Sequence, residues 1–303
     1  MHTIELKNIS KSFGEHLAVD ELSLNVPQGS VYGFIGPNGS GKTTTLRMIM
    51  NILYPDSGEI DVFGGKLKSS SNDRIGYMPE ERGLYKRMKV RELLLFFGGL
   101  KNEKDIKTKV DNWLERLELT DWANKKVEAL SKGMGQKVQF IATIVSQPEL
   151  AILDEPFTGL DPVNTEVLKD AILELQKQGT TVVFSTHDMS MAENMCDFIF
   201  MIYKGRKVLD GTLESIQGEY GSDTIRLRAK NGGVHLQDIP GVDKVNNYGH
   251  MQELRMAENA DPDQILKSIL ERTSILSFDI VKPSLHDIFV RIAAPDTKET
   301  ENA

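Results

Sequence analysis

Apolar and polar positions alternate over residues 3–9, which predicts a strand, and the uniformly apolar run at residues 31–35 predicts a second, buried strand. Two further apolar runs, at residues 150–153 and 181–184, have the same character. Helical spacing of apolar residues covers residues 43–52 and 163–178. Strands that alternate with helices favour a mostly parallel sheet, so the pattern predicts an α/β fold.

The pattern changes twice along the chain. Residues 90–130 have helical spacing without strands, which predicts an inserted helical subdomain at about residues 85–137. After about residue 220 the chain predicts short strands at residues 224–229, 242–248, 251–256 and 275–281, and a helix at 261–272 that Asp261 caps and Pro262 opens. We therefore expect a main domain at residues 1–220, a small α+β domain at 221–294 and a disordered polar tail at 295–303.

Composition limits the classes of partner. The 303 residues leave room for about two domains, because single cores rarely grow much beyond 250 residues. A net charge of −8 gives no electrostatic reason to expect nucleic-acid binding. The apolar run at residues 93–97 is far shorter than the ~20 residues that span a bilayer, and the N-terminus does not resemble an export signal.

A glycine-rich loop lies between the second predicted strand and the helix after it. Glycines there let backbone N–H groups converge on phosphate oxygens, and the positive end of the helix adds to the attraction. Lys42 is placed to hold the outer phosphates and Thr43 to coordinate Mg²⁺. The expected phosphate-binding residues are Gly36, Pro37, Asn38, Gly39, Ser40, Gly41, Lys42, Thr43 and Thr44.

Two acids end the buried run at residues 150–153. Asp154 is expected to orient Mg²⁺, and Glu155 points elsewhere and is expected to activate the attacking water as general base. A phosphate-binding loop and an acid pair together predict hydrolysis of a nucleoside triphosphate.

Five further motifs, at residues 10–14, 75–80, 130–134, 159–161 and 184–187, occur in the order of one family. With them the chain resembles the ATP-binding subunit of an ABC transporter over residues 1–220. The resemblance implies a P-loop NTPase fold of ABC type, with an antiparallel β part, that binds ATP and Mg²⁺ in the interface of a head-to-tail homodimer. It assigns adenine stacking to Phe13, contact with the partner's γ-phosphate to Ser131 and Gly133, a dimer contact to Asp161, and a catalytic role to His187 beside Glu155 and Lys42.

Glu80 stands where that family normally has glutamine. A carboxylate can still approach Mg²⁺ but cannot donate a hydrogen bond, so we expect Thr43, Glu80 and Asp154 at the metal. Gly135 falls in the first turn of the helix that Ser131 opens, where glycine costs about 1 kcal/mol relative to alanine.

Residues 79–85, 130–134 and 283–289 are similar to ATPases of the ABC-2 export class, particularly its sodium-extrusion-like branch. The resemblance implies a cytoplasmic subunit, peripheral at the inner face of the membrane, that powers export of an unidentified substrate, such as sodium or a small toxic compound, through an ABC-2-type permease. Leu84, Tyr85 and Met88 are expected either to line a groove for that permease or to pack in the helical subdomain. A soluble ABC ATPase and a weakly hydrolysing regulatory module remain alternatives.

Overall fold

The computed structural model describes residues 1–66, 73–81, 83–101, 105–221, 223–230, 236–249, 251–257 and 259–297. The chain divides into two compact units, Met1–Leu213 and Glu214–Ala303. Each unit has its own hydrophobic core and is described by itself.

A six-stranded sheet forms the centre of the first unit. Its strands lie in the order β5-β6-β7-β3-β8-β9, and all are parallel except the edge strand β9. They are β3 (Val31–Ile35), β5 (Ile75–Met78), β6 (Leu150–Asp154), β7 (Thr181–Thr186), β8 (Phe198–Tyr203) and β9 (Arg206–Gly211). Both faces of the sheet are buried, which explains why the four central strands read as nearly continuous apolar runs. The predicted α/β fold with a mostly parallel sheet is confirmed.

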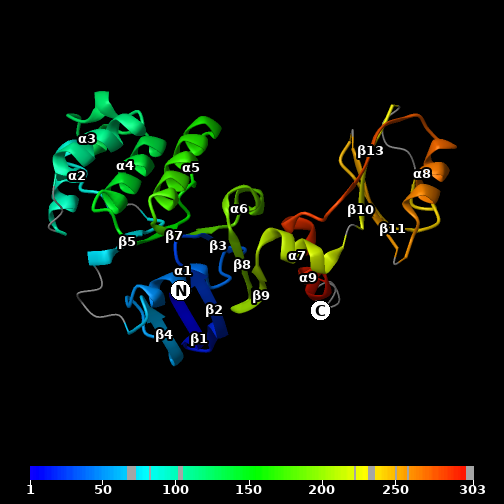
Figure 1. The fold of residues 1–303 in the computed structure, drawn as a ribbon, viewed down its shortest axis with the longest axis horizontal. Coiled ribbons are helices and arrows are strands. Elements are labelled where there is room, and N and C mark those ends of the chain that lie inside the picture. Colours follow the sequence, from blue (N-terminus) through cyan, green and yellow to red (C-terminus); the bar gives the residue numbers. More distant parts are fainter. Residues whose placement is uncertain are drawn as a thin grey trace. The chain divides into compact units, whose positions relative to one another are not determined.

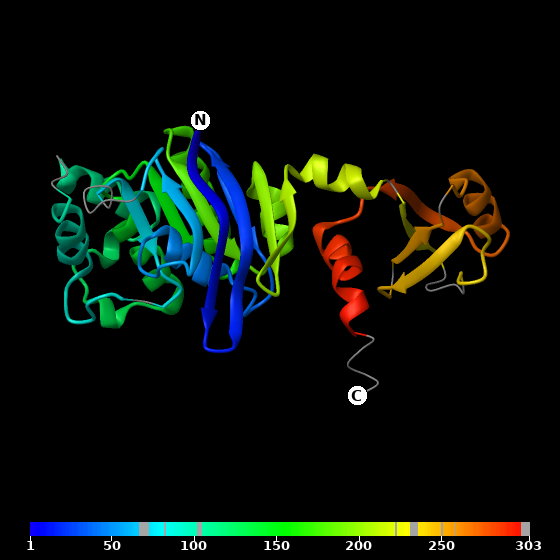
Figure 2. The same cartoon turned by 90° about the horizontal axis from the view of Figure 1, so that it is seen from below.

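A second, antiparallel sheet and α1 (Lys42–Ile49) together cover one face of the central sheet. Its order is β2-β1-β4, from β1 (His2–Phe13), β2 (His16–Pro27) and β4 (Ser57–Val62). The two long strands run side by side (Figure 2), and the layer they form lies with α1 below the central sheet in Figure 1. Tyr32 and Phe34 of β3 point into this core, whereas Val31 points into the core on the other face.

Helices cover the opposite face of the central sheet (Figure 1). They are α2 (Val90–Gly99), α3 (Ile106–Arg116), α4 (Lys132–Ile144), α5 (Pro162–Lys177) and α6 (Met189–Met195), with 3-10 turns at Thr120–Trp122 and Val127–Ala129. Trp113 of α3 packs edge-on against Phe140 of α4, with ring centroids 6.1 Å apart. The helical spacing at residues 90–130 therefore arises from packing of α2 and α3 against α4.

The second unit is a four-stranded antiparallel sheet with one amphipathic helix packed on it. The strands lie in the order β11-β12-β10-β13, from β10 (Thr224–Ala229), β11 (Val242–Asn247), β12 (Gln252–Met256) and β13 (Ile275–Val281). Asp261 caps α8 (Pro262–Leu270), which buries Ile265 and Ile269 against the sheet. The unit also contains most of α7 (Leu213–Tyr220) and all of α9 (Leu285–Thr297).

The polar tail expected from residue 295 overlaps the end of α9 and stays a prediction. Helix α9 continues through Pro295 to Thr297. The rest of the expected tail, residues 298–303, lies outside the described residues.

Within the described residues, none of the helices is both long and apolar enough to cross a membrane.

Candidate nucleotide-binding site

The glycine loop joins β3 to α1 and surrounds a cavity of about 320 Å³. The residues that line the cavity are Phe13, His16, Ala18, Asn38, Gly39, Ser40, Gly41, Lys42, Thr43, Thr44, Glu80 and Glu155. Four segments of the sequence therefore meet there, and three of them follow the carboxyl ends of β3, β5 and β6, the edge at which open α/β sheets bind ligands.

The backbone conformation and the close packing at residue 41 both require glycine. It has φ +109°, and a Cβ atom there would lie 2.5 Å from the carbonyl oxygen of Ala18. Gly41 is the residue before α1, so the loop can turn directly into the positive end of that helix.

Lys42 is buried within the loop, 6% exposed. Its Nζ donates to the carbonyl oxygens of Gly36, at 2.7 Å, and Pro37, at 3.2 Å, and lies 3.8 Å from Oε1 of Glu155. Burial lowers the pKa of Lys42, while the carboxylates of Glu155, Asp154 and Glu80 act in the opposite direction. A phosphate oxygen at this ammonium would offset the desolvation that lowers its pKa.

Asp154 ends β6 and is 1% exposed. Its Oδ1 accepts hydrogen bonds from Oγ1 of Thr43, at 3.2 Å, and from Oγ of Ser185, at 2.5 Å. Its Oδ2 is buried and has no hydrogen-bond partner in the described chain. An unpaired buried carboxylate oxygen is costly, and a metal-bound water would satisfy it, so the residues here fit Mg²⁺.

Among the described residues, no three His, Cys, Asp or Glu side chains lie together as ligands of one metal ion. A Mg²⁺ ion held near Thr43, Asp154 and Glu80 would therefore take its remaining ligands from phosphate oxygens and water, which Mg²⁺ commonly keeps. Glu80 lies just beyond β5, at the edge of the cavity.

Glu155 turns away from Asp154 because its backbone is left-handed, with φ +50°. Its N–H donates to Oγ of Ser185, at 2.9 Å, and its carboxylate oxygens lie 3.0 and 3.1 Å from Nδ1 of His187. A carboxylate can only accept a hydrogen bond, so this contact requires the His187 proton on Nδ1. Glu155 as a whole is 7% exposed, and this contact holds its carboxylate at the wall of the cavity.

Phe13 lies at the rim of the cavity and is half exposed. It ends β1, where it pairs with His16 at the start of β2. Residues paired across an antiparallel ladder share one face, so His16 also lines the cavity. Sequence reasoning missed His16 and Ala18, although the two-residue turn after Phe13 is a signal that would have placed His16 opposite it.

Ser131, Gly133 and Asp161 do not line this cavity. Ser131 caps α4 by accepting a hydrogen bond from the N–H of Met134, at 3.2 Å, and its side chain is exposed. Gly133 packs near Leu160, where a Cβ atom would meet Cδ2 at 3.4 Å. The start of α4 and the loop before α5 are therefore neighbours.

Asp161 uses its carboxylate within the chain. It caps α5 by accepting from the N–H of Asn164, at 2.9 Å, and from the Asn164 side-chain amide, at 2.5 Å. These two bonds from Asn164 hold the pKa of Asp161 below its usual value.

A second cavity, of about 250 Å³, lies between α2, α4 and the segment after β5. Leu84, Phe97 and Leu100 line it, and Tyr85 rests against Phe96 and Phe97 with ring centroids 5.9 and 6.3 Å away. Met88 does not line it and packs against the core instead. Leu84 also packs against the core, and Tyr85 lies beside the cavity without lining it, so a groove for the permease stays a prediction.

The main unit and the small unit match different families. Residues 19–158 match the family described as ABC transporter, and residues 211–293 match the family described as ATP-binding protein DrrA1-3-like, C-terminal domain.

Curated proteins resemble the chain over nearly its full length. It is 38% identical to an uncharacterized ABC transporter ATP-binding protein, YhaQ, of Bacillus subtilis, over 95% of this chain and 97% of that protein. It is 31% identical to the Nod factor export ATP-binding protein I of Sinorhizobium fredii, over 98% of this chain and 87% of that protein. A solved ATP-binding subunit of an ABC transporter superposes with a TM-score of 0.68 at 28% identity, over 72% of this chain and 93% of that chain.

Proposed function

This chain belongs to the family of ABC transporter ATP-binding proteins and is an ATPase, and from that premise we propose that it powers an exporter by hydrolysing Mg-ATP between two copies of itself. The observation that carries the proposal is that Lys42, Thr43 and Glu155 line one cavity. Asp154 accepts a hydrogen bond from Thr43, and His187 contacts Glu155, so both are linked to that cavity.

Each of these side chains has a separate task in the proposed reaction. Lys42 holds the outer phosphates. Glu155 accepts a proton from the attacking water, and His187 holds the Glu155 carboxylate in place. Thr43 and Asp154 hold Mg²⁺, which neutralises charge on the phosphate oxygens when it is bound. Ser185 joins the two acids, because it donates to Asp154 and accepts from the N–H of Glu155.

The position of Ser131 supports a dimer. The start of α4 is exposed and lies outside the cavity formed by the same chain, so a γ-phosphate at Ser131 and Gly133 would be one that a second copy holds. We therefore propose a head-to-tail dimer with two ATP molecules in its interface, to which Asp161 contributes as the cap of α5.

The apolar cavity beside α2 is our proposed docking site for the permease. Leu100 and Tyr85 are 61% and 55% exposed, and an apolar helix from a membrane subunit would cover them. The subunit would then sit at the inner face of the membrane, held there by its permease.

Helix α4 supports coupling between the docking cavity and the phosphates. Nε2 of Gln139, which lines the docking cavity, donates to the carbonyl oxygen of Pro79, next to Glu80, at 2.7 Å. Nε2 of Gln136, one turn earlier, donates to the carbonyl oxygen of Pro156, next to Glu155, at 2.9 Å. Movement of α4 as one body would shift Glu80 and Glu155 together.

Two measurements test this function. Mg-ATP hydrolysis should fall by about 10²–10⁴-fold in Glu155→Gln, the range for loss of general base catalysis, while ATP-dependent dimers accumulate in light scattering. A Glu155→Gln protein that stays monomeric at millimolar Mg-ATP would refute the dimer. A wild-type protein that binds ATP with negligible turnover would favour a regulatory module instead.

The second measurement is capture of the permease. Tyr85→Glu and Leu100→Glu should abolish co-purification with a polytopic membrane protein yet leave basal ATPase activity intact, whereas Tyr54→Glu, at an equally exposed aromatic residue elsewhere, should change neither. Retention of the permease by both groove variants would remove the docking site from the proposal.

We also propose a class of exporter for this subunit. Similarity to an export ATP-binding protein and to the DrrA1-3-like C-terminal family supports an ABC-2-type exporter. The sodium-extrusion-like branch stays a prediction from the motifs at residues 79–85, 130–134 and 283–289. Transport assays with sodium and with small toxic compounds would decide between these substrates.

A further inference from the structure

A polar cavity of about 450 Å³ lies in the second unit, between its sheet and the start of α9. Alternate residues of β11 and β12 share one face of the sheet, and here that face carries Lys244, Asn246, Glu253 and Arg255. The opposite face is apolar and packs against α8. The sheet therefore has one face used for folding and one polar face that the core does not use.

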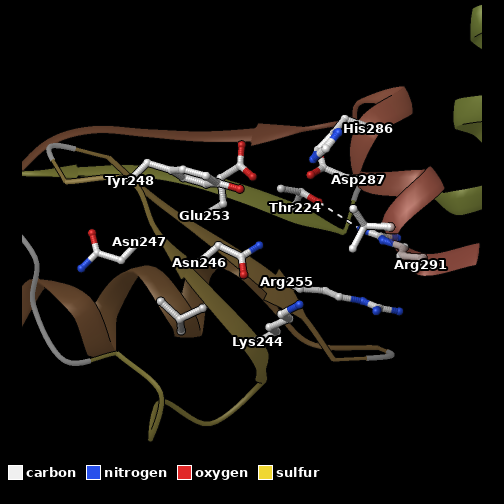
Figure 3. A pocket seen from close by; sticks show the side chains of 12 residues that line it. Thr224, Lys244, Asn246, Asn247, Tyr248, Glu253, Arg255, His286, Asp287 and Arg291 are labelled. Carbon is white, nitrogen blue, oxygen red and sulfur yellow. Dashed lines mark hydrogen bonds between the residues drawn. The ribbon is translucent and has the colours of Figure 1, made fainter. Parts of the chain in front are cut away.

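Three cations gather at one end of this cavity (Figure 3). Lys244 and Arg255 are direct cross-strand partners, and Arg291 approaches them from α9. Like charges directly opposite each other in a sheet are destabilising. The arrangement thus costs stability unless negative charge offsets it.

The nearby carboxylates offset this charge only in part. Asp223 holds Arg291 through two hydrogen bonds, at 2.8 and 2.9 Å, and lies 3.6 Å from Nε of Arg255. Lys244 has no ion pair within the part of the chain that the structure describes. Asp223 and Asp243 line an adjoining cavity and not this one. Asp223 is therefore shared between Arg291 and Arg255, and the Lys244 ammonium beside them has no carboxylate partner among the described residues.

The remainder of the cavity wall can accept hydrogen bonds. Glu253 is 6% exposed and pairs with Arg226 at 2.8 Å, and Asp287 lies at the start of α9. Burial raises the pKa of Tyr248, and the nearby carboxylates of Glu253 and Asp287 raise it further. These oxygens suit the hydroxyl or ammonium groups of a ligand body, whereas the cationic end suits a compact dianion.

We propose that this cavity binds a phosphate monoester whose body carries hydroxyl groups. Lys244 and Arg255 bind the phosphoryl oxygens, with Arg291 held beside them by Asp223, and Glu253 accepts from a hydroxyl of the body. A tetrahedral group with three outer oxygens matches cations that arrive from two strands and a helix. The ester is either a soluble metabolite or the headgroup of a monoester phospholipid, since both present the same chemistry.

Calorimetry on the full chain tests the site, with Mg-ADP present to fill the nucleotide cavity. The probe is sn-glycerol 3-phosphate, with glycerol as the uncharged comparison, and vesicles containing phosphatidic acid are tested in parallel by flotation. We expect one of the two phosphate probes to bind the wild type and glycerol not to bind. Binding of the soluble ester identifies a metabolite site, and binding of the vesicles alone identifies a headgroup site.

Variants show whether binding uses this cavity. Lys244→Gln combined with Arg255→Gln should weaken binding by roughly a hundredfold, at about tenfold for each charged hydrogen-bond donor removed. Lys267→Gln, an exposed position on α8, should bind like the wild type. Failure of both phosphate probes to bind the wild type, or equal affinity in the double variant, would overturn the proposal. A melting temperature for each variant confirms that the proteins compared are folded.

Discussion

Ser185→Ala tests how the two acids of the nucleotide site are held. Ser185 lies on β7, fully buried, and its Oγ donates to Asp154 at 2.5 Å and accepts from the N–H of Glu155 at 2.9 Å. Alanine removes both bonds and leaves the backbone N–H of Glu155 buried without a partner. It also leaves Asp154 with Thr43 as its one hydrogen-bond donor among the described residues.

The magnitude follows from these two bonds. A hydrogen bond to a charged group contributes about 1.5–3 kcal/mol, and an unsatisfied buried donor costs about 1–3 kcal/mol. Because both act through one hydroxyl they are not additive, so we expect the free energy of unfolding to fall by about 2–4 kcal/mol. Misplacement of Glu155 by about 1 Å would lower kcat by about 10²-fold.

Urea denaturation and steady-state ATPase assays measure both effects. Ser30→Ala is the matched control, because Ser30 is also buried but donates to the carbonyl oxygen of Pro27, away from the acids. It should lose stability without losing kcat. A Ser185→Ala enzyme with wild-type kcat, or an equal loss of kcat in Ser30→Ala, would refute the positioning role.

Three further predictions concern the glycine loop and the acid beside it. Gly41→Ala should cost at least about 1–2 kcal/mol and abolish ATP binding, because its Cβ would collide with the Ala18 carbonyl, whereas Gly218→Ala, in α7 of the second unit, has open space and an ordinary helical backbone and should keep binding; equal affinities in the two variants would contradict this. Burial lowers the pKa of Lys42, so the folded chain loses this proton at a lower pH than the unfolded chain, and the unfolding free energy of the wild type relative to Lys42→Met should rise as the pH approaches 10.5; a flat difference in urea titrations would argue against it. Glu80→Gln should keep most Mg-ATP turnover, within about tenfold, because an amide oxygen can replace the carboxylate at the metal; collapse of turnover at saturating Mg-ATP would show that the charge is required.

Local patterns predicted the part of the fold that positions the phosphate loop. The run at residues 31–35 became β3 with its predicted bounds, and residues 150–153 and 181–184 became β6 and β7, slightly longer. Both faces of these strands are buried, so hydrophobicity alone marks them.

Strand β2 was not predicted, although Leu22, Leu24 and Val26 alternate with polar residues as a half-buried strand requires. Glu21 has φ +44°, and the register of the pairing with β1 shifts at the same place. The alternation of apolar and polar residues therefore breaks between Val19 and Leu22. A bulge of this kind depends on the partner strand and leaves only an interrupted pattern in the sequence.

Contacts between distant segments account for what was missed in the site. Ser185 reaches Asp154 across neighbouring parallel strands, and His16 reaches the cavity through its pairing with Phe13. A serine in a strand has common structural roles, so its residue type gives no reason to select it. The turn after Phe13 selects His16 only once the two flanking segments are recognised as a hairpin. The register of the sheet decides both.

The left-handed backbone at Glu155 has a consequence for how this protein tolerates change. Glycine and asparagine adopt φ near +50° more readily than glutamate, by roughly 1–2 kcal/mol in the case of glycine. Replacement by either residue should therefore relieve strain in the turn while it removes the proton acceptor. With Glu155 as the general base of the proposed reaction, a screen for thermal stability would enrich variants that are more stable and inactive.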